Sequence, residues 1–452
     1  MNPLSPGDLV DPSRWMSTLA RQNPVIRLKE LSIPGTHDSC SRLGFCKPIS
    51  TTQYATLEQQ LDAGIRFLDV RIKVDDAGGT KGLKVVHGME DVGDYYGSQT
   101  GRLSFETVLT RIHGWMNQPE HRDECVIIKV VDCDTQDLNA ERAGYDTHTR
   151  VHDIWKRVEA GSPGKKSLDF NTQHSTAEFL EMTLHQAKGR LLLWRVFKDP
   201  EVLQGTRKAF GLDLYALKNE ARYDNNPYFD VHSPAPGGRA QWVSLRGQSL
   251  YTWKFKGPQQ TLTYADKMNA VVHRLYDAWC GHTEGVSKRT EDSYCLNELN
   301  IAAIYQSSGD RQDVEVERYY PVTNATSIHP LMGELLEQML APQPTLPTLS
   351  HKGARGNGSV GIILFDWADD PTGALRDFEK TRHFNEPLYK KVIAFNFQPS
   401  KVFDRDSHGV DSIRYQFLDA APHAELQYQN GHGWHRAPPP PSAGFEISTL
   451  TA

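Results

Sequence analysis

Five residues of types that serve acid–base catalysis occur in this sequence where strand-like segments end. Histidine exchanges a proton near neutral pH, arginine presents a planar fork of donors that matches phosphate oxygens, and aspartate can orient an imidazole and stabilise its charged form. The five residues are His37, Asp38, Arg71, His87 and Asp366. Their combination is suited to the cleavage of a phosphodiester.

Two histidines and one arginine can divide the steps of that reaction among them. One histidine removes a proton from the attacking hydroxyl, and the other donates a proton to the leaving oxygen. An arginine between them stabilises the charge that builds on the phosphate oxygens. A carboxylate such as Asp366 can hold one imidazole in place.

Each residue also has a plainer structural explanation. His37 could cap a turn or bind a buried carbonyl group. Arg71 could pair only with Asp69, because alternation along a strand puts both on one face. Asp366 could cap the end of its strand. The coincidence of these residue types at several strand ends is what favours a catalytic site.

The elements that would position these residues alternate between strands and helices. The first strand is a short apolar run that ends at Pro34-Gly35, and the seven others are expected at 66–74, 84–88, 125–131, 191–195, 250–255, 299–306 and 360–365. Helices are expected at 55–63, 104–117, 177–188, 264–279, 329–340 and 386–394. This alternation favours parallel pairing. Eight such strands close a barrel whose active site lies at the carboxyl ends of the strands.

We therefore predict an α/β protein with a distorted TIM-type (β/α)8 barrel over residues 1–400. A long insertion is expected at about 205–247, which is rich in Gly, Pro, Asn and Arg and shows little periodicity. Residues 401–452 fall outside the alternating pattern and are expected to form a small C-terminal extension.

Bulk composition limits the partners of the chain. It has 452 residues, 38% of them hydrophobic, and a net charge of −6 with a pI of about 6.3. No basic run predicts a nucleic-acid partner, and no apolar run is long enough to span a bilayer. No secretory signal stands at the N-terminus, so we expect a protein that is cytoplasmic or exported without such a signal. We also expect a monomer. The six cysteines show no metal-binding spacing and are expected to be free thiols.

Three segments resemble the X-region of the phosphatidylinositol-specific phospholipases C, most of all the small single-domain bacterial type. They surround His37, Arg71 and His87, and the specific element is the run Ile-Pro-Gly-Thr-His-Asp-Ser that starts at Ile33. Segments 189–195, 296–309 and 359–397 are similar to the remaining strands of that type, in the same order. The resemblance implies a phospholipid substrate, reached peripherally at a membrane surface.

The resemblance also implies a role for each of the five residues. His37 matches the general base, which takes the proton of the inositol 2-hydroxyl, and His87 matches the general acid, which protonates the diacylglycerol oxygen. Arg71 matches the arginine that holds the phosphoryl oxygens. Asp366 matches the carboxylate behind the base, and Asp38 matches the aspartate that works with the acid. The implied products are diacylglycerol and a cyclic inositol phosphate.

Arg71 bears on the cofactor as well. Eukaryotic relatives and some bacterial ones hold calcium with carboxylates at this strand, and calcium needs a cluster of oxygen ligands. A guanidinium group there repels a metal ion and supplies positive charge itself. We therefore predict that the chain needs neither a metal nor any other cofactor.

The headgroup-binding residues are matched less completely. Arg195 matches a residue that contacts the inositol ring. The following strand of the bacterial type carries an acidic residue and a tyrosine, whereas 250–255 offers Trp253 and Phe255. We predict that these aromatic side chains stack on the ring and that a carboxylate for its hydroxyls is lost.

Two other functions stay open from the sequence. The first is a phosphodiesterase on the same barrel that acts on a different headgroup. Glycerophosphodiesterases and sphingomyelinase-D-like enzymes need a metal with paired carboxylates near the first two strands, and Arg71 argues against them. The second is a lipid-binding module without catalysis, which would tolerate the loss of either histidine.

Overall fold

The computed structural model describes most of the expected elements. The described residues are 10–47, 50–75, 82–88, 90–97, 101–133, 140–161, 176–197, 211–215, 217, 228–234, 241–249, 264–280, 293–299, 321–340, 359–366, 388–397, 410–417, 424–430 and 433–436.

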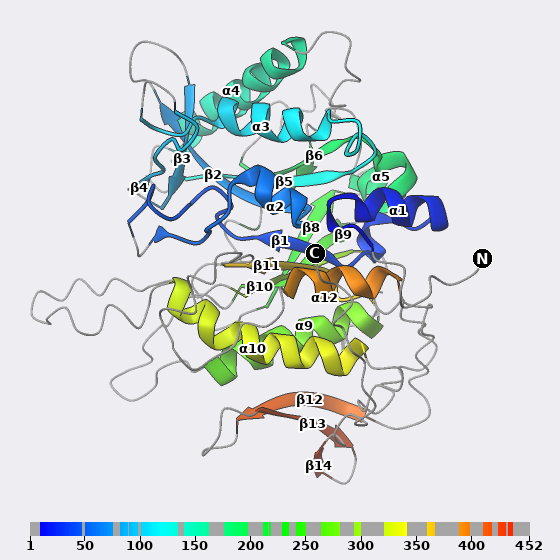
Figure 1. Cartoon of the computed structure of the whole chain (residues 1–452). Coiled ribbons are helices and arrows are strands. Elements are labelled where there is room, and N and C mark those ends of the chain that lie inside the picture. Colours follow the sequence, from blue (N-terminus) through cyan, green and yellow to red (C-terminus); the bar gives the residue numbers. More distant parts are fainter. Residues whose placement is uncertain are drawn as a thin grey trace, which may run out of the picture.

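A curled, mostly parallel sheet of the TIM-barrel type forms the centre of the molecule (Figure 1). Its strands are β1 Ile33–Thr36, β2 Phe67–Asp75, β3 Gly82–His87, β4 Glu90–Asp91, β5 Val126–Asp132, β6 Leu191–Val196, β7 Leu212–Asp213, β8 Tyr228–Pro234, β9 Gln241–Gln248, β10 Tyr294–Glu298 and β11 Ile362–Phe365. The order is β7-β6-β5-β2-β1-β11-β10-β9-β8, so β7 and β8 are its edges among the described strands. The first and last strands of the predicted barrel, β1 and β11, are direct parallel neighbours.

Helices cover the outer face of this sheet on both sides of β1 and β11 (Figure 1). Those of the first half are α1 Trp15–Gln22, α2 Leu57–Asp62, α3 Phe105–Met116, α4 Ala140–Ala160, α5 Thr176–Glu181 and α6 Leu184–Ala187. Those of the second half are α9 Tyr264–Cys280, α10 Pro321–Leu340 and α12 Leu388–Ala394. Because helices cover the outer face of the sheet and side chains fill the inside of the barrel, strands such as β5 are buried along their whole length. This explains why they read as continuous apolar runs.

Several predicted elements are confirmed with small shifts. The helix predicted at 104–117 is α3, where the Ser104 hydroxyl caps the N-terminus by accepting from the Thr107 amide at 3.0 Å. The helix predicted at 177–188 is divided into α5 and α6. Pro34-Gly35 lies inside β1 and does not end it, because the carbonyl of Pro34 accepts from the Arg66 amide and continues the pairing.

Two predictions about the strands are wrong. Segment 82–87 is antiparallel to β2, because it is the returning arm of a hairpin and not a barrel strand. The strand β10 was not predicted and ends just before the predicted strand at 299–306, of which residues 300–306 lie outside the described residues. The predicted insertion at 205–247 instead contains β7, β8 and β9, which continue the main sheet. Residues 250–255 lie outside the described residues, so their prediction as a strand is not tested.

A separate three-stranded antiparallel sheet follows the barrel. Its strands are β12 Val410–Phe417, β13 Ala424–Asn430 and β14 Gly433–Arg436, and β12 lies near α9 (Figure 1). The division of the chain at residue 400 stays a prediction. No helix among the described residues has both the length and the apolar character needed to cross a bilayer. Cys40 and Cys46, which are close in sequence, are free thiols.

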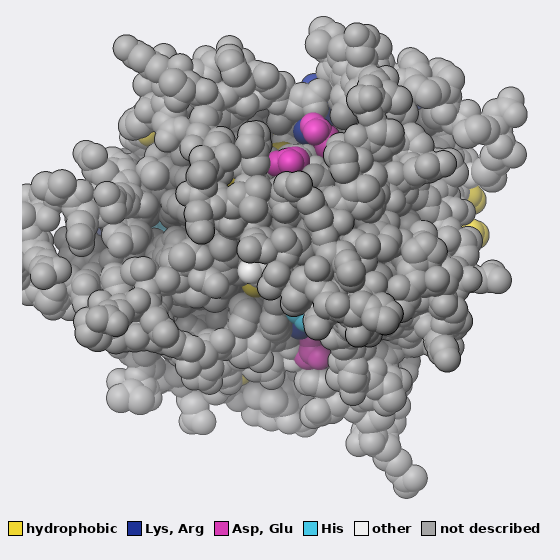
Figure 2. Space-filling model, turned by 90° about the horizontal axis from the view of Figure 1, so that it is seen from below, with side chains coloured by type: hydrophobic (Ala, Val, Ile, Leu, Met, Phe, Trp, Pro, Cys, Tyr) yellow, Lys and Arg dark blue, Asp and Glu magenta, His cyan; other side chains and the backbone are white. Residues whose placement is uncertain are grey.

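Few large hydrophobic side chains are exposed among the described residues. Figure 2 shows described side chains on one face only as small separate groups, with acidic beside basic ones. The large hydrophobic side chains that are exposed among the described residues are Val25, Leu43 and Phe45. The apolar residues are instead concentrated in one core between the sheet and its helices.

Gly35 allows β1 to pack between β2 and β11, and its replacement tests that packing. A Cβ atom there would lie 2.5 Å from Leu364 Cδ2 and 2.9 Å from the Phe67 carbonyl oxygen. We expect Gly35→Ala to lower the free energy of unfolding by about 1–3 kcal/mol, the usual cost of overpacking. Urea unfolding measures this value.

Gly114→Ala is the matched control, because a Cβ atom at Gly114 on α3 meets nothing within 4 Å. Here we expect unchanged or slightly higher stability, by up to about 1 kcal/mol, since alanine is the better helix former. Equal effects of the two substitutions would contradict the close packing at β1.

Candidate active site

Polar side chains from several strands converge at the carboxyl end of the sheet, inside the barrel. Pairing puts Gly35, Phe67 and Leu364 level with one another on the inner face. Two residues further along each strand lie His37, Asp69 and Asp366. Since alternate residues of a strand share one face, all three side chains point into the barrel.

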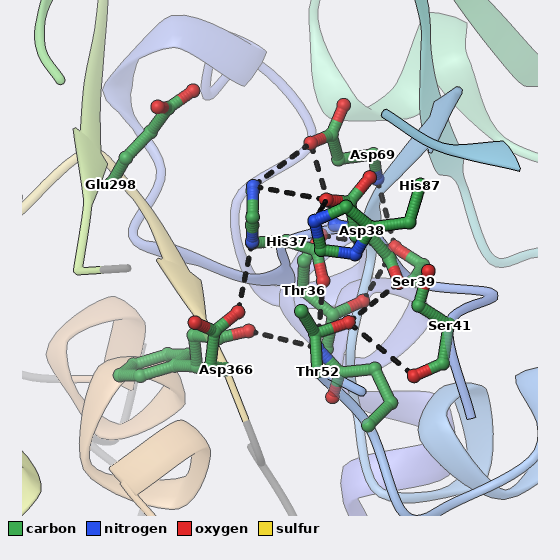
Figure 3. A network of polar contacts seen from close by, with 12 residues as sticks. Thr36, His37, Asp38, Ser39, Ser41, Thr52, Asp69, His87, Glu298 and Asp366 are labelled. Atoms are coloured by element: carbon green, nitrogen blue, oxygen red, sulfur yellow. Dashed lines mark hydrogen bonds and ion pairs between the residues drawn. The ribbon is translucent and has the colours of Figure 1, made fainter. Parts of the chain in front are cut away.

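His37 lies between Asp366 and Arg71. Its Nδ1 atom is 2.9 Å from Asp366 Oδ1 (Figure 3). Its Nε2 atom is 2.5 Å from Nη2 of Arg71. A guanidinium group has donors only, so Nε2 must accept and Nδ1 must carry the proton that is donated to Asp366. This tautomer leaves the basic lone pair of His37 on the side of Arg71 and Asp38.

Burial and the neighbouring charges keep His37 neutral. The histidine is almost fully buried, and this burial, together with the positive charge of Arg71, holds its pKa well below the ordinary value. Burial likewise raises the pKa of the Asp366 carboxyl group well above its usual range, with Asp38 adding to the effect and Arg71 opposing it. A neutral imidazole with a fixed tautomer is the form that a general base requires.

Arg71 links the aspartates of the site. Its Nε atom is 2.7 Å from Asp38 Oδ1, and its Nη2 atom is 3.6 Å from Asp69 Oδ2. His37, Asp38 and Asp69 could hold a metal ion, since one ligand atom from each lies within 4.8 Å of the others. The guanidinium group of Arg71 contacts all three of these residues, so positive charge already lies among the potential ligands.

Asp38 adopts a backbone conformation that L-residues rarely adopt. Its φ of 42° is the only positive value at a non-glycine residue in the described part of the chain. Aspartate tolerates this left-handed region better than most residues. The hydroxyl of Thr52 and the amide of Ser41 both donate to the Asp38 carbonyl, at 2.9 and 2.8 Å. Local strain of this kind often marks a functional position.

The hairpin of β2 and β3 brings His87 to the same place. Because β3 runs antiparallel to β2, it returns His87 to the level of the strand ends. Its Nδ1 atom donates to the carbonyl of Ser50 at 2.8 Å, and its Nε2 atom lies 3.4 Å from Asp38 Oδ2. The His37 and His87 rings are 6.3 Å apart and nearly perpendicular.

Side chains beneath the β1 loop hold its backbone in place. The Gln53 amide donates to the carbonyls of His37 and Phe365 at 2.8 and 3.1 Å. The hydroxyl of Ser39 accepts from the Asp69 amide at 2.8 Å. These bonds tie the loop to both neighbouring strands and so fix the direction of His37 and Asp38.

Two charged residues of the site were missed by the sequence analysis. The Nζ atom of Lys129 on β5 is 3.2 Å from Asp69 Oδ1 and 3.1 Å from Oε1 of Glu298, at the end of β10. A lysine within the otherwise apolar run 125–131 was a signal, since buried lysines need a partner. Glu298 gave no such signal, because the strand was expected to start after it.

Arg195 does not join this cluster. Arg195 pairs with Val130 of β5, which in turn pairs with Val70 of β2. These two valines come one position after Lys129 and Asp69, so the side chains at this level, including that of Arg195, point to the opposite face of the sheet. Arg195 therefore lies on the outer face of the sheet, where it is 2.8 Å from Asp213 Oδ2. Its contact with the headgroup stays a prediction.

The strand that follows β6 in the sheet was misidentified from the sequence. It is β7, which carries Asp213 and is followed by Tyr215. Trp253 and Phe255 lie outside the described residues, and their proposed stacking is not tested.

Comparison with known proteins identifies relatives for part of the chain. It is 45% identical over 69 residues to the 1-phosphatidylinositol phosphodiesterase of Listeria monocytogenes, covering 14% of this chain and 21% of that protein. It is 32% identical over 145 residues to PI-PLC X domain-containing protein 1 of Mus musculus, covering 26% of this chain and 39% of that protein. The matches thus span less than half of either relative. No protein-family model matches the chain.

The fold comparison extends over most of the chain. A phosphatidylinositol-specific phospholipase C from Staphylococcus aureus superposes with a TM-score of 0.52 at 18% identity, covering 87% of this chain and 99% of that one. At this level of identity the structural similarity shows only the fold. The sequence matches show similarity to the phosphodiesterase and to the PI-PLC X domain-containing protein. By sequence over part of its length, and by fold over most of it, the chain is similar to phosphatidylinositol-specific phospholipases C.

Proposed function

We propose that this protein is a phosphodiesterase of the phosphatidylinositol-specific phospholipase C type, which cleaves a phosphoinositide to diacylglycerol and a cyclic inositol phosphate. The observation that carries the proposal is the set of contacts around Asp38. Its carboxylate lies 3.3 Å from His37 Nε2, 3.4 Å from His87 Nε2 and 2.7 Å from Arg71 Nε. Three groups that reach one small anion can also reach the oxygens of one phosphate.

In the proposed reaction, proton transfer is divided between the two histidines. Nε2 of His37 accepts the proton of the headgroup 2-hydroxyl while that oxygen forms a bond to phosphorus. The bond from phosphorus to the glycerol oxygen breaks, and His87 donates its Nε2 proton to this leaving oxygen. Arg71 stabilises the charge on the phosphoryl oxygens, and Asp366 stabilises the imidazolium form of His37. Exchange of protons with water then restores both histidines.

Replacement of the two histidines tests this division. We expect His37→Ala and His87→Ala each to lower kcat by about 10²- to 10⁴-fold, the usual contribution of a general base or acid. The measurement is phosphorus NMR on a panel of phospholipid vesicles, which also identifies the headgroup that is cleaved. The exposed His185 on α6 provides the control, since His185→Ala should leave the rate unchanged. Full activity in either catalytic variant would instead favour the lipid-binding module.

The proposed enzyme works without a metal ion. Because Arg71 contacts His37, Asp38 and Asp69, we expect full activity in excess EDTA. The assay compares initial rates with and without the chelator, and then after addition of calcium. A loss of activity that calcium restores would reject the metal-free mechanism.

Arg71 should also set the acid limb of the pH profile. Its positive charge opposes protonation of His37, so removing that charge raises the pKa of the histidine. We expect the acid limb of kcat/KM to move to higher pH in Arg71→Leu, in addition to a lower rate. Arg71→Lys keeps a positive charge and should retain the acid limb of the native protein. An unchanged limb in Arg71→Leu would show that His37 is not the titrating base.

A further inference from the structure

The inner wall of the barrel opposite His37 carries a second polar group of side chains that the proposed reaction does not use. Glu298, at the end of β10, reaches Lys129 on β5 at 3.1 Å, so this ion pair spans the barrel. The second oxygen of Glu298 accepts from the hydroxyl of Ser249. In Figure 3 the carboxylates of Glu298 and Asp69 lie on the same side of the His37 ring, away from Asp366.

This group lies next to the groups proposed to bind phosphate. Lys129 is 3.2 Å from Asp69, and Asp69 is 3.6 Å from Arg71. The negative charge of Glu298 acts to raise the pKa of His37. Burial acts to raise the pKa of Glu298 itself, but nearby groups, foremost the positive charge of Lys129, lower it overall. A headgroup whose phosphate contacts Arg71 therefore has its far side near Glu298 and Lys129.

Hydrogen-bonding capacity remains on both partners. A carboxylate has about four acceptor positions, and the described side chains use one on each oxygen of Glu298. An ammonium group has three donors, and Lys129 uses one in its hydrogen bond to Glu298 while it also forms an ion pair with Asp69. The barrel wall thus offers free acceptor positions beside a free donor.

We propose that Glu298 is a specificity-determining residue, which accepts hydrogen bonds from the hydroxyls of a polyol headgroup while Lys129 donates to them. Adjacent hydroxyls both donate and accept, so they match this pair. A trimethylammonium headgroup can do neither. A primary ammonium can donate to Glu298 but is repelled by Lys129 and Arg71. This inference rests on the proposed function, because the proposed function supplies the position of the phosphate.

Binding of two soluble phosphate monoesters tests the assignment without turnover. Inositol 1-phosphate carries the ring hydroxyls, and ethyl phosphate has the same phosphate without them. By isothermal titration we expect the native protein to bind inositol 1-phosphate at least about tenfold more tightly than ethyl phosphate, as expected for hydrogen bonds to a charged group. Glu298→Ala should remove this preference and leave the affinity for ethyl phosphate unchanged.

Two further variants separate recognition from structure. Glu298→Gln keeps the size of the side chain and one acceptor oxygen, so we expect a partial loss of preference in a protein that is still folded at the assay temperature. Glu106→Gln on α3 removes a carboxylate from an exposed ion pair with Arg157 and should change neither affinity. Equal weakening of both ligands in the Glu298 variants, or an unchanged preference, would overturn the proposal and leave Glu298 as a structural brace for Lys129.

The cleavage assay distinguishes this inference from the proposed function. If the native protein shows the preference and the Glu298 variants lose it, but no phosphoinositide is cleaved, the proposed function fails and the assignment of Glu298 holds. If it cleaves phosphoinositide and the Glu298 variants keep the preference, the assignment fails and the proposed function holds.

Discussion

The position of one guanidinium group is the constraint on which the site depends. Arg71, whose side chain is 25% exposed, enters the barrel among His37, Asp38 and Asp69, and a cation that is partly removed from water must be matched by nearby negative charge. The same group fixes the tautomer of His37, because arginine can only donate. It also brings positive charge among the atoms that could otherwise ligate a metal. The proposed base strength, phosphate binding and independence of a metal all rest on this one side chain.

Compensation of this charge extends across the barrel. Asp69 lies between Arg71 and Lys129, and Lys129 lies between Asp69 and Glu298. Opposite charges thus alternate from β2 to β5 and on to β10. Removing one partner of a buried pair leaves an uncompensated charge, which costs about 3–5 kcal/mol. This alternation explains how so many charged groups are tolerated next to a core as apolar as Phe67, Trp194 and Tyr294.

The sequence was sufficient to predict the residues that directly follow short apolar runs, and insufficient where geometry depends on distant pairing. His37 and Asp366 each come directly after a buried strand of four residues. β7 has only two residues, too few for any periodicity. Arg195 also ends a strand, but the face it occupies depends on the register of β6 with β5. The Lys129–Glu298 contact joins residues 169 positions apart, and no local pattern reports it.

The two histidines differ in their exposure, and this difference indicates how the substrate is oriented in the proposed reaction. The His37 side chain is 7% exposed and is held by the rim of the barrel, whereas His87 is 21% exposed and is carried by the hairpin that returns from β2. In the proposed reaction the headgroup hydroxyl meets the buried base, and the leaving diacylglycerol meets the more exposed acid. The headgroup then points into the barrel, toward Lys129 and Glu298, and the lipid chains point outward. A buried base with an exposed acid is the arrangement that an enzyme needs if its substrate stays anchored in a membrane while only the headgroup is enclosed.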